Sequence, residues 1–369
     1  MKKLVPLTFF LLCFSCAAYA LPKEILKDKY MMQITTALKE KDYAKAEPLF
    51  EKIEELMLPL PTSFHYFKGE TYYHTGKYAQ SKKSIETYLV TAGKEGKFYT
   101  GALNILNQAE SILSIIPDSM VFVKGGCFKY SDLNISQELC VDSFQVSAHE
   151  VTVGKFSKFV RETGYKTHAE AGTGGCNVKR YRGEGFEFSY HPNSNNNWLN
   201  PHPDYKINEN HPVTCINNND IQSYISWLTN KTGIKYRLLS MAEWIYLVSE
   251  KGKKRLSSKE AVGNLFQEDD GYIYTSPVGH YENNKINIFD LYGNVQELTC
   301  TPFSPKDYSK NRISIDYYLT CNPLRSNSDN EIALGAFNSS IVAYIDVAGS
   351  RFSLPSNTIG FRLASDVNQ

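Results

Sequence analysis

The chain has 369 residues, with 40 lysines and arginines against 39 aspartates and glutamates, so its formal net charge at pH 7 is +1. Because acids and bases are interspersed, no polyanion-binding surface is expected and a nucleic-acid partner is excluded from the prediction. The length suits one medium-sized domain plus a small one. After residue 20, no apolar run approaches the roughly 20 residues that a membrane-spanning helix needs.

The first twenty residues have the three parts of a secretory signal peptide. A short basic start, Met1–Lys3, precedes an apolar run of about fifteen residues from Leu4 to Ala18. Ala18-Tyr19-Ala20 fits the small-x-small cleavage pattern. We therefore expect residues 1–20 to be a signal peptide and the mature chain to be periplasmic or secreted. A buried N-terminal helix is the alternative.

Cleavage after residue 20 would remove two of the eight cysteines, Cys13 and Cys16. Lipidation of Cys16 is a second alternative, but Cys13 and Phe14 stand where a lipobox prefers leucine and a small residue. The six remaining cysteines are Cys127, Cys140, Cys176, Cys215, Cys300 and Cys321. An even number in an exported chain predicts disulfides, and six cysteines allow fifteen pairings. The sequence contains no CxxC motif and no closely spaced Cys/His cluster, so no zinc site is predicted.

Residues 26–114 are predicted to form helical hairpins similar to tetratricopeptide (TPR) repeats. Lys41–Ala46 recurs 35 residues later as Gly76–Ser81, and an amphipathic helix follows each copy, with Phe50 matching Ile85 and Ile53 matching Tyr88. The period is close to the 34 residues of a TPR unit. Two interpretations stay open for this region: a groove that binds a protein partner, or a helical spacer.

Ile115–Asp118 marks a boundary, and residues 118–366 have a different character. Strand-like segments at 121–123 and 144–146, helical segments at 155–163 and 220–232, and many turns rich in Asn, Gly, Ser and Pro follow. This pattern predicts a loop-rich α+β domain after the α-helical one.

A series of short motifs runs through this second region in a fixed order. They are Met120–Gly126, His149–Thr152, Thr163–Thr167, Asn197–Trp198, His211–Val213, Tyr236–Leu238, Ala242–Trp244, Pro277–Gly279, Leu291–Val295 and Gly360–Arg362. The series resembles the formylglycine-generating enzyme, or sulfatase-modifying factor, family. The resemblance implies a C-type-lectin-like fold, in which long loops are attached to a small mixed sheet.

The resemblance also implies how the cysteines pair. The family's positions correspond to Cys176–Cys215 and Cys300–Cys321, which leaves Cys127–Cys140 to bridge a local hairpin. We expect all six cysteines to have a structural role.

Two structural calcium sites are implied by the same resemblance. The first matches Asn264, Leu265, Asp270 and Tyr272, and the second matches Asp290, Gly293, Val295 and Glu297. Calcium prefers several oxygen ligands, and backbone carbonyls in turns supply them without extra charge. The alternative is that the acids of these segments are ordinary turn residues.

The thiol pair of the catalytic family members is missing. Those enzymes bind copper through two cysteines near the C-terminal end of the domain, and the corresponding positions here are Ser340 and Ile345. A hydroxyl binds cuprous ion poorly and an alkyl side chain cannot bind it, so no copper is expected.

We therefore predict an exported member of this family that lacks cysteine-to-formylglycine oxidase activity and acts as a periplasmic binding or scaffold module. Its helical repeats would recruit a protein partner. Two alternatives remain: an oxidoreductase that acts on a protein or small molecule with non-standard catalytic residues, and a purely structural envelope component. Whether the chain is an enzyme stays open, because a fold does not determine a function.

Overall fold

The structure is a computed structural model. It describes residues 21–132, 135–172, 175–181, 186–193, 195–248, 271–281, 284, 286–291, 293–302, 331–334 and 355–367. The chain divides into two compact units, Met1–Glu110 and Ser111–Gln369. The predicted signal peptide, residues 1–20, lies outside the described residues.

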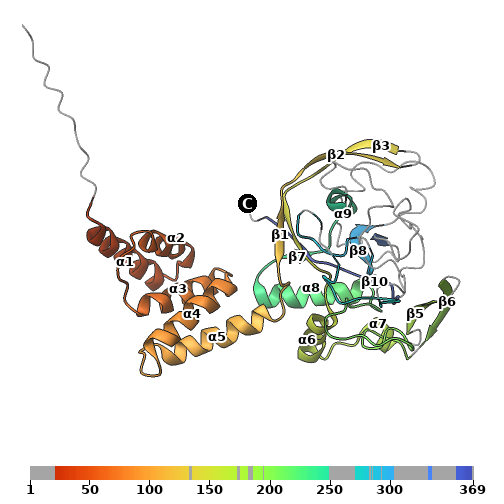
Figure 1. Cartoon of the computed structure of the whole chain (residues 1–369), viewed down its shortest axis with the longest axis horizontal. Coiled ribbons are helices and arrows are strands. Elements are labelled where there is room, and N and C mark those ends of the chain that lie inside the picture. Colours follow the sequence, from red (N-terminus) through yellow and green to blue (C-terminus); the bar gives the residue numbers. More distant parts are fainter. Residues whose placement is uncertain are drawn as a thin grey trace, which may run out of the picture. The chain divides into compact units, whose positions relative to one another are not determined.

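Five helices form the first unit and the connection that follows it (Figure 1). They are α1 (Lys23–Lys39), α2 (Tyr43–Glu54), α3 (Ser63–His74), α4 (Tyr78–Ala92) and α5 (Tyr99–Leu113). Helices α2 and α4 begin 35 residues apart, at the two copies of the sequence repeat. The matched residues Phe50, Ile85, Ile53 and Tyr88 are all at most 2% exposed. The repeat therefore forms the core of the unit as the sequence predicts.

Helices α3 and α4 pack closely because one glycine and one serine face each other. A Cβ atom at Gly69 would lie 2.6 Å from the Cδ1 of Ile85, so only glycine fits there. The hydroxyl of Ser81, which is fully buried, donates a 2.7 Å hydrogen bond to the Gly69 carbonyl. These contacts hold two helices together at small residues.

The described part of the second unit contains four small sheets and, after α5, four helices. The four-stranded sheet has the order β1 (Met120–Val123), β4 (Phe144–Ser147), β11 (Ala364–Asp366) and β7 (Tyr236–Arg237). The three-stranded sheet has the order β10 (Ile359–Gly360), β8 (Gln296–Pro302) and β9 (Glu331–Leu334). The other two sheets are hairpins, β2 (Gly126–Asp132) with β3 (Ile135–Val141) and β5 (Cys176–Tyr181) with β6 (Phe186–Asn193). Its helices are α6 (Val153–Thr163), α7 (His168–Ala171), α8 (Asn218–Thr232) and α9 (Met241–Val248).

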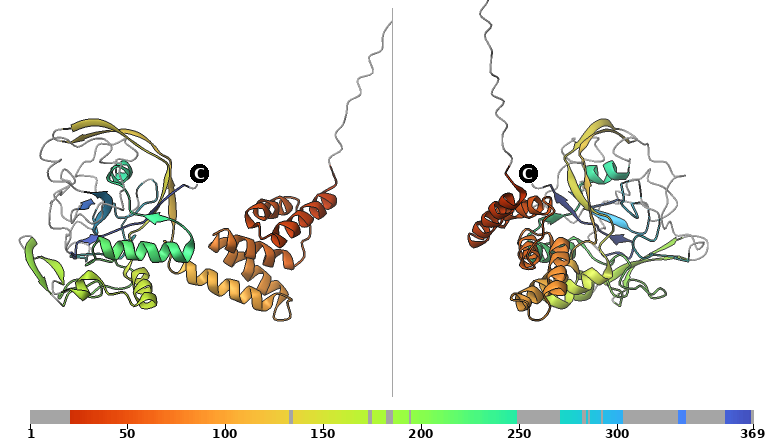
Figure 2. Two further views of the ribbon diagram at one scale, coloured as in Figure 1. Left: turned by 180° about the vertical axis from the view of Figure 1, so that it is seen from behind. Right: turned by 60° about the vertical axis from the view of Figure 1, so that its left-hand side comes forward.

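The four-stranded sheet separates two hydrophobic cores. Alternate residues of β1 show this, since Val123 packs with α9 and the β2–β3 hairpin while Met120 packs with α6 and α8. The β2–β3 hairpin lies over α9 in each view (Figures 1 and 2). Side chains alternate between faces along a strand, so one short strand serves both cores.

Local sequence explains where the two longer helices of this unit begin and end. The Asn217 side chain accepts from the Asp220 backbone, and the Asp220 side chain accepts from the Asn217 backbone, which forms a capping box before α8. Thr152 caps α6 in a simpler way, through the backbone N–H of Lys155. Both helices end at a glycine with positive φ, Gly164 or Gly233, the conformation that glycine adopts without steric cost.

The disulfides Cys127–Cys140 and Cys176–Cys215 are formed, as expected. The first joins paired residues of the β2–β3 hairpin on its exposed face, whereas both cysteines of the second are fully buried. Cys300 is also disulfide-bonded, and its expected partner Cys321 lies outside the described residues. Disulfides are consistent with an oxidising compartment.

The predicted order of a helical region followed by a loop-rich α+β domain is confirmed. Among the described residues, no helix combines the length and the apolar character that crossing a membrane requires.

Removing the buried disulfide should destabilise the second unit more than removing the exposed one. The sequence separations are 39 and 13 residues, so loop entropy predicts losses of about 4 and about 3 kcal/mol. Lost packing adds to the loss of unfolding free energy for the buried pair, Cys176–Cys215, but not for the exposed pair. Urea unfolding of Cys176→Ala/Cys215→Ala and of Cys127→Ala/Cys140→Ala would measure both. A larger loss for the hairpin pair would contradict this ranking.

Candidate functional site

Four charged side chains are buried together in the second unit. Glu150 follows β4, Asp290 lies in the loop before β8, Glu297 is on β8, and Arg362 lies between β10 and β11. Each is at most 3% exposed. Such a group requires internal partners, because an unpaired buried charge is very costly.

Arg362 forms the centre of this group. Its Nε donates to Glu297 Oε1 at 2.7 Å. Its Nη atoms donate to the carbonyls of Ser147, Ala148 and Phe289 at 3.3, 3.2 and 2.9 Å. The guanidinium thus connects β8, the end of β4 and the loop that contains Phe289.

Glu297 is fully occupied by two donors. Besides Arg362 on Oε1, the Trp244 indole Nε1 of α9 donates to Oε2 at 3.1 Å. Both oxygens of Glu297 are therefore hydrogen-bonded. A buried ion pair needs such additional hydrogen bonds to offset the cost of its desolvation.

Glu150 and Asp290 are each satisfied on one oxygen only. Glu150 Oε1 accepts from the Asn294 amide at 3.1 Å, and Asp290 Oδ2 accepts from the Gly279 backbone N–H at 2.6 Å. Glu150 Oε2 and Asp290 Oδ1 are buried and have no hydrogen-bond partner among the described residues. Buried polar atoms rarely lack a hydrogen-bond partner, and each exception calls for an explanation.

The two carboxyl groups also perturb each other. Burial raises the pKa of Glu150 well above its ordinary value, and the nearby charge of Asp290 raises it further. Burial likewise raises the pKa of Asp290. One arginine cannot neutralise three carboxylates, so this group holds an excess of negative charge that favours a proton or a cation.

The loop before β8 has an unusual backbone. Asp290, Gly293 and Asn294 have φ values of 55°, 106° and 60°. Left-handed conformations at non-glycine residues are uncommon and cluster at ligand sites. The Asn294 side chain stabilises this loop conformation, because its oxygen accepts a hydrogen bond from the Ser276 backbone N–H at 3.0 Å.

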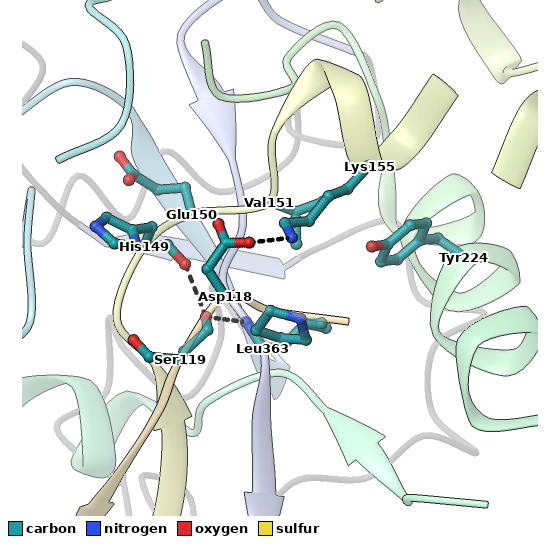
Figure 3. Close-up of a pocket in the computed structure, with 10 residues that line it drawn as sticks. Asp118, Ser119, His149, Glu150, Val151, Lys155, Tyr224 and Leu363 are labelled. Atoms are coloured by element: carbon teal, nitrogen blue, oxygen red, sulfur yellow. Dashed lines mark hydrogen bonds and ion pairs between the residues drawn. The ribbon is translucent and has the colours of Figure 1, made fainter. Parts of the chain in front are cut away.

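A cavity next to this group is too small for a substrate. Its volume is about 10 Å³, which is room for one water molecule. Figure 3 shows the ion pair of Lys155 with Asp118, 2.8 Å apart, between Glu150 and the hydroxyl of Tyr224. That hydroxyl is buried without a partner among the described residues, and burial raises its pKa. A bound water would satisfy it.

Comparison with known proteins decides the family. The model of the sulfatase-modifying factor enzyme 1-like domain matches residues 113–367. This chain belongs to the sulfatase-modifying factor family. Helices α1 to α4, and α5 except for its last residue, lie outside the match.

Two curated relatives agree with this assignment, and one solved structure is similar to part of the chain. The formylglycine-generating enzyme of Mus musculus is 28% identical over 193 residues, which are 44% of this chain and 50% of the mouse protein. That of Mycobacterium tuberculosis is 26% identical over 254 residues, 56% of this chain and 80% of the other. The structure of PvdO from Pseudomonas aeruginosa is 20% identical and aligns with a TM-score of 0.49, covering 68% of this chain and 97% of that one. This chain spans about half the length of the mouse enzyme.

The sulfatase-modifying factor domain brings together the residues of the second expected calcium site. Asp290, Gly293, Val295 and Glu297 are all buried in the loop and the start of β8. Glu297, however, is bound by Arg362 and Trp244. Glu150, which sequence reasoning treated only as part of a family motif, supplies a free oxygen instead.

The other expected positions are mostly beyond what the structure describes. Asn264, Leu265 and Asp270 of the first calcium site lie outside the described residues, as do Ser340 and Ile345. Tyr272 is described and half-buried.

The second site fits a calcium ion in part. The buried Asp290 Oδ1, which has no hydrogen-bond partner among the described residues, is the kind of oxygen that calcium needs. Glu297 would have to share its carboxylate with Arg362. Among the described residues, no three acidic, histidine or cysteine side chains are grouped to hold a metal, so backbone oxygens and water would complete the shell.

Replacing Arg362 should be among the most damaging changes in the domain. Arg362→Leu leaves three carboxylates buried without a positive charge, and we expect a loss of about 3–5 kcal/mol of unfolding free energy. The matched control is Arg237→Leu. Its side chain is 25% exposed and pairs with Glu243 and Asp366, so its loss should be about 1–2 kcal/mol. Equal losses in urea unfolding would contradict the central role of Arg362.

Proposed function

We propose that this chain is an exported sulfatase-modifying-factor protein that does not convert cysteine to formylglycine and that serves as a binding or scaffold module. The observation that carries the proposal is the use of its cysteines. Of the six that follow residue 20, Cys127, Cys140, Cys176, Cys215 and Cys300 are all disulfide-bonded.

A two-thiolate copper site needs two cysteines that are not occupied in structural bridges. Only Cys321 is left outside the bonds described, and no cysteine follows it in the chain. The family's thiol positions are Ser340 and Ile345, whose side chains cannot replace thiolates. An intact framework with these residues changed supports binding rather than oxidation.

We expect no formylglycine to form when the purified protein is incubated with copper, oxygen and a peptide that carries a sulfatase cysteine motif. Mass spectrometry of the peptide is the readout. The Mycobacterium tuberculosis relative, named as a formylglycine-generating enzyme, serves as the positive control under the same conditions. Clear turnover by this chain would overturn the proposal and favour an oxidase with other residues.

Calcium is proposed as a structural cofactor at Asp290. The ion would neutralise part of the excess charge shared by Asp290 and Glu150, whose free oxygens have no partner among the described residues. It would hold the loop in its left-handed conformation and play no chemical role.

Calcium should therefore raise the melting temperature, and a chelator should lower it. At one hundred times the dissociation constant, binding adds about 2.7 kcal/mol to the unfolding free energy. Asp290→Ala should abolish the shift measured by calorimetry. Asp118→Ala is the control, because the side chain of Asp118 is 67% exposed. A calcium shift that survives in Asp290→Ala would exclude this site.

The helical unit is proposed to recruit a protein partner. Its helices form a compact unit of their own, and one side of this unit carries a groove. A spacer would need no such groove.

A further inference from the structure

The first unit has a groove between α1, α2 and α3 with a volume of about 360 Å³. Phe50 and Phe64 form its floor, both 1% exposed and with ring centroids 5.2 Å apart. Met31 and Leu38 of α1 border it and are half-buried. This volume falls in the range of ligand pockets, and the lining is mostly apolar with a few polar groups, as such pockets are.

Glu70 of α3 lines the same groove and is the one half-buried glutamate of the described helical unit without an ion-pair partner. Six other glutamates there have a lysine partner: Glu24 with Lys27, Glu40 with Lys45, Glu47 with Lys77, Glu54 with Lys68, and both Glu86 and Glu110 with Lys82. The remaining Glu51, Glu55 and Glu95 are exposed. No basic side chain of the described residues lies within ion-pair distance of Glu70. Its carboxyl is half-buried, and desolvation raises its pKa.

The surroundings of Glu70 keep this charge uncompensated. Burial raises the pKa of the Tyr43 and Tyr66 hydroxyls, and the nearby charge of Glu70 raises both further. Tyr43 itself stacks on His74 at 4.1 Å. A partly desolvated carboxylate is less stable without a nearby cation than with one. A cation on a bound ligand would therefore offset its cost of desolvation.

We propose that the groove between α1, α2 and α3 binds a segment of a partner protein that carries apolar side chains and one lysine or arginine, with the basic group paired to Glu70. The apolar side chains would cover Phe50, Phe64, Met31 and Leu38. Lys39 also lines the groove, but it is exposed and forms no ion pair with Glu70. Anionic ligands such as fatty acids or nucleic acids are therefore disfavoured, because they would place a negative charge against Glu70. The inference rests on the docking role proposed above and specifies the chemistry of the partner.

The test uses a phage-displayed library of random nonapeptides, selected on the purified full-length protein. The expected result is enrichment of peptides with two or more apolar residues and one Lys or Arg. Synthetic copies of the enriched peptides, measured by fluorescence anisotropy, should bind at least tenfold more weakly to Glu70→Lys. Replacing the peptide's basic residue by glutamine should cause a similar loss, and Glu70→Lys should restore binding of the corresponding glutamate peptide.

Glu95→Lys is the matched control, because it makes the same charge change at an exposed residue outside the groove. Its affinity should stay within twofold of the parent protein, and circular dichroism should show both variants folded. No enrichment, enrichment without a basic residue, or equal binding to both variants would overturn the inference. The formylglycine assay examines the other unit, so failure here leaves its result unaffected and the two outcomes can be told apart.

Discussion

The buried ion pair between Arg362 and Glu297 is the interaction on which the second unit depends. The two residues are 65 positions apart in the sequence, and the guanidinium also binds three carbonyls from two other segments. In a domain with short strands and long loops, few backbone ladders connect distant segments. A planar group with five donors in a fixed geometry can do so at one point. The small sheets are then held in register by a side chain as well as by their own hydrogen bonds.

The same arrangement produces an imbalance of charge. Glu150 and Asp290 lie beside the ion pair, and each has one oxygen without a partner among the described residues. A domain under selection for stability alone would gain by replacing such groups with apolar ones. They are kept beside a left-handed loop at Asp290, Gly293 and Asn294, and their excess negative charge favours a proton or a cation. This excess and the ion pair that connects the segments therefore lie side by side and share the charge of Arg362.

Sequence patterns predicted the parts of this protein that depend on neighbouring residues. The 35-residue repeat placed Phe50 and Ile85 at equivalent core positions because helical periodicity is local, and both are buried. The pair Cys176–Cys215 followed from the family resemblance, and Cys127–Cys140 was the pair that the resemblance left over. The role of Glu297 did not follow, since its occupation by Arg362 and Trp244 depends on contacts 65 and 53 residues away. Glu150 was missed for the same reason: nothing near it in the sequence shows that it meets Asp290.

The two units use their acidic residues in opposite ways. Around Arg362 the surplus carboxylates are almost completely buried, so only a small ion or a proton can reach them without unfolding part of the domain. In the helical unit, Glu70 borders an open groove and remains half-exposed, so a cation attached to a large ligand can reach it. Burial therefore limits the class of ligand that each group can accept: a small ion or a proton for the first group, and a basic side chain of a larger ligand for the second.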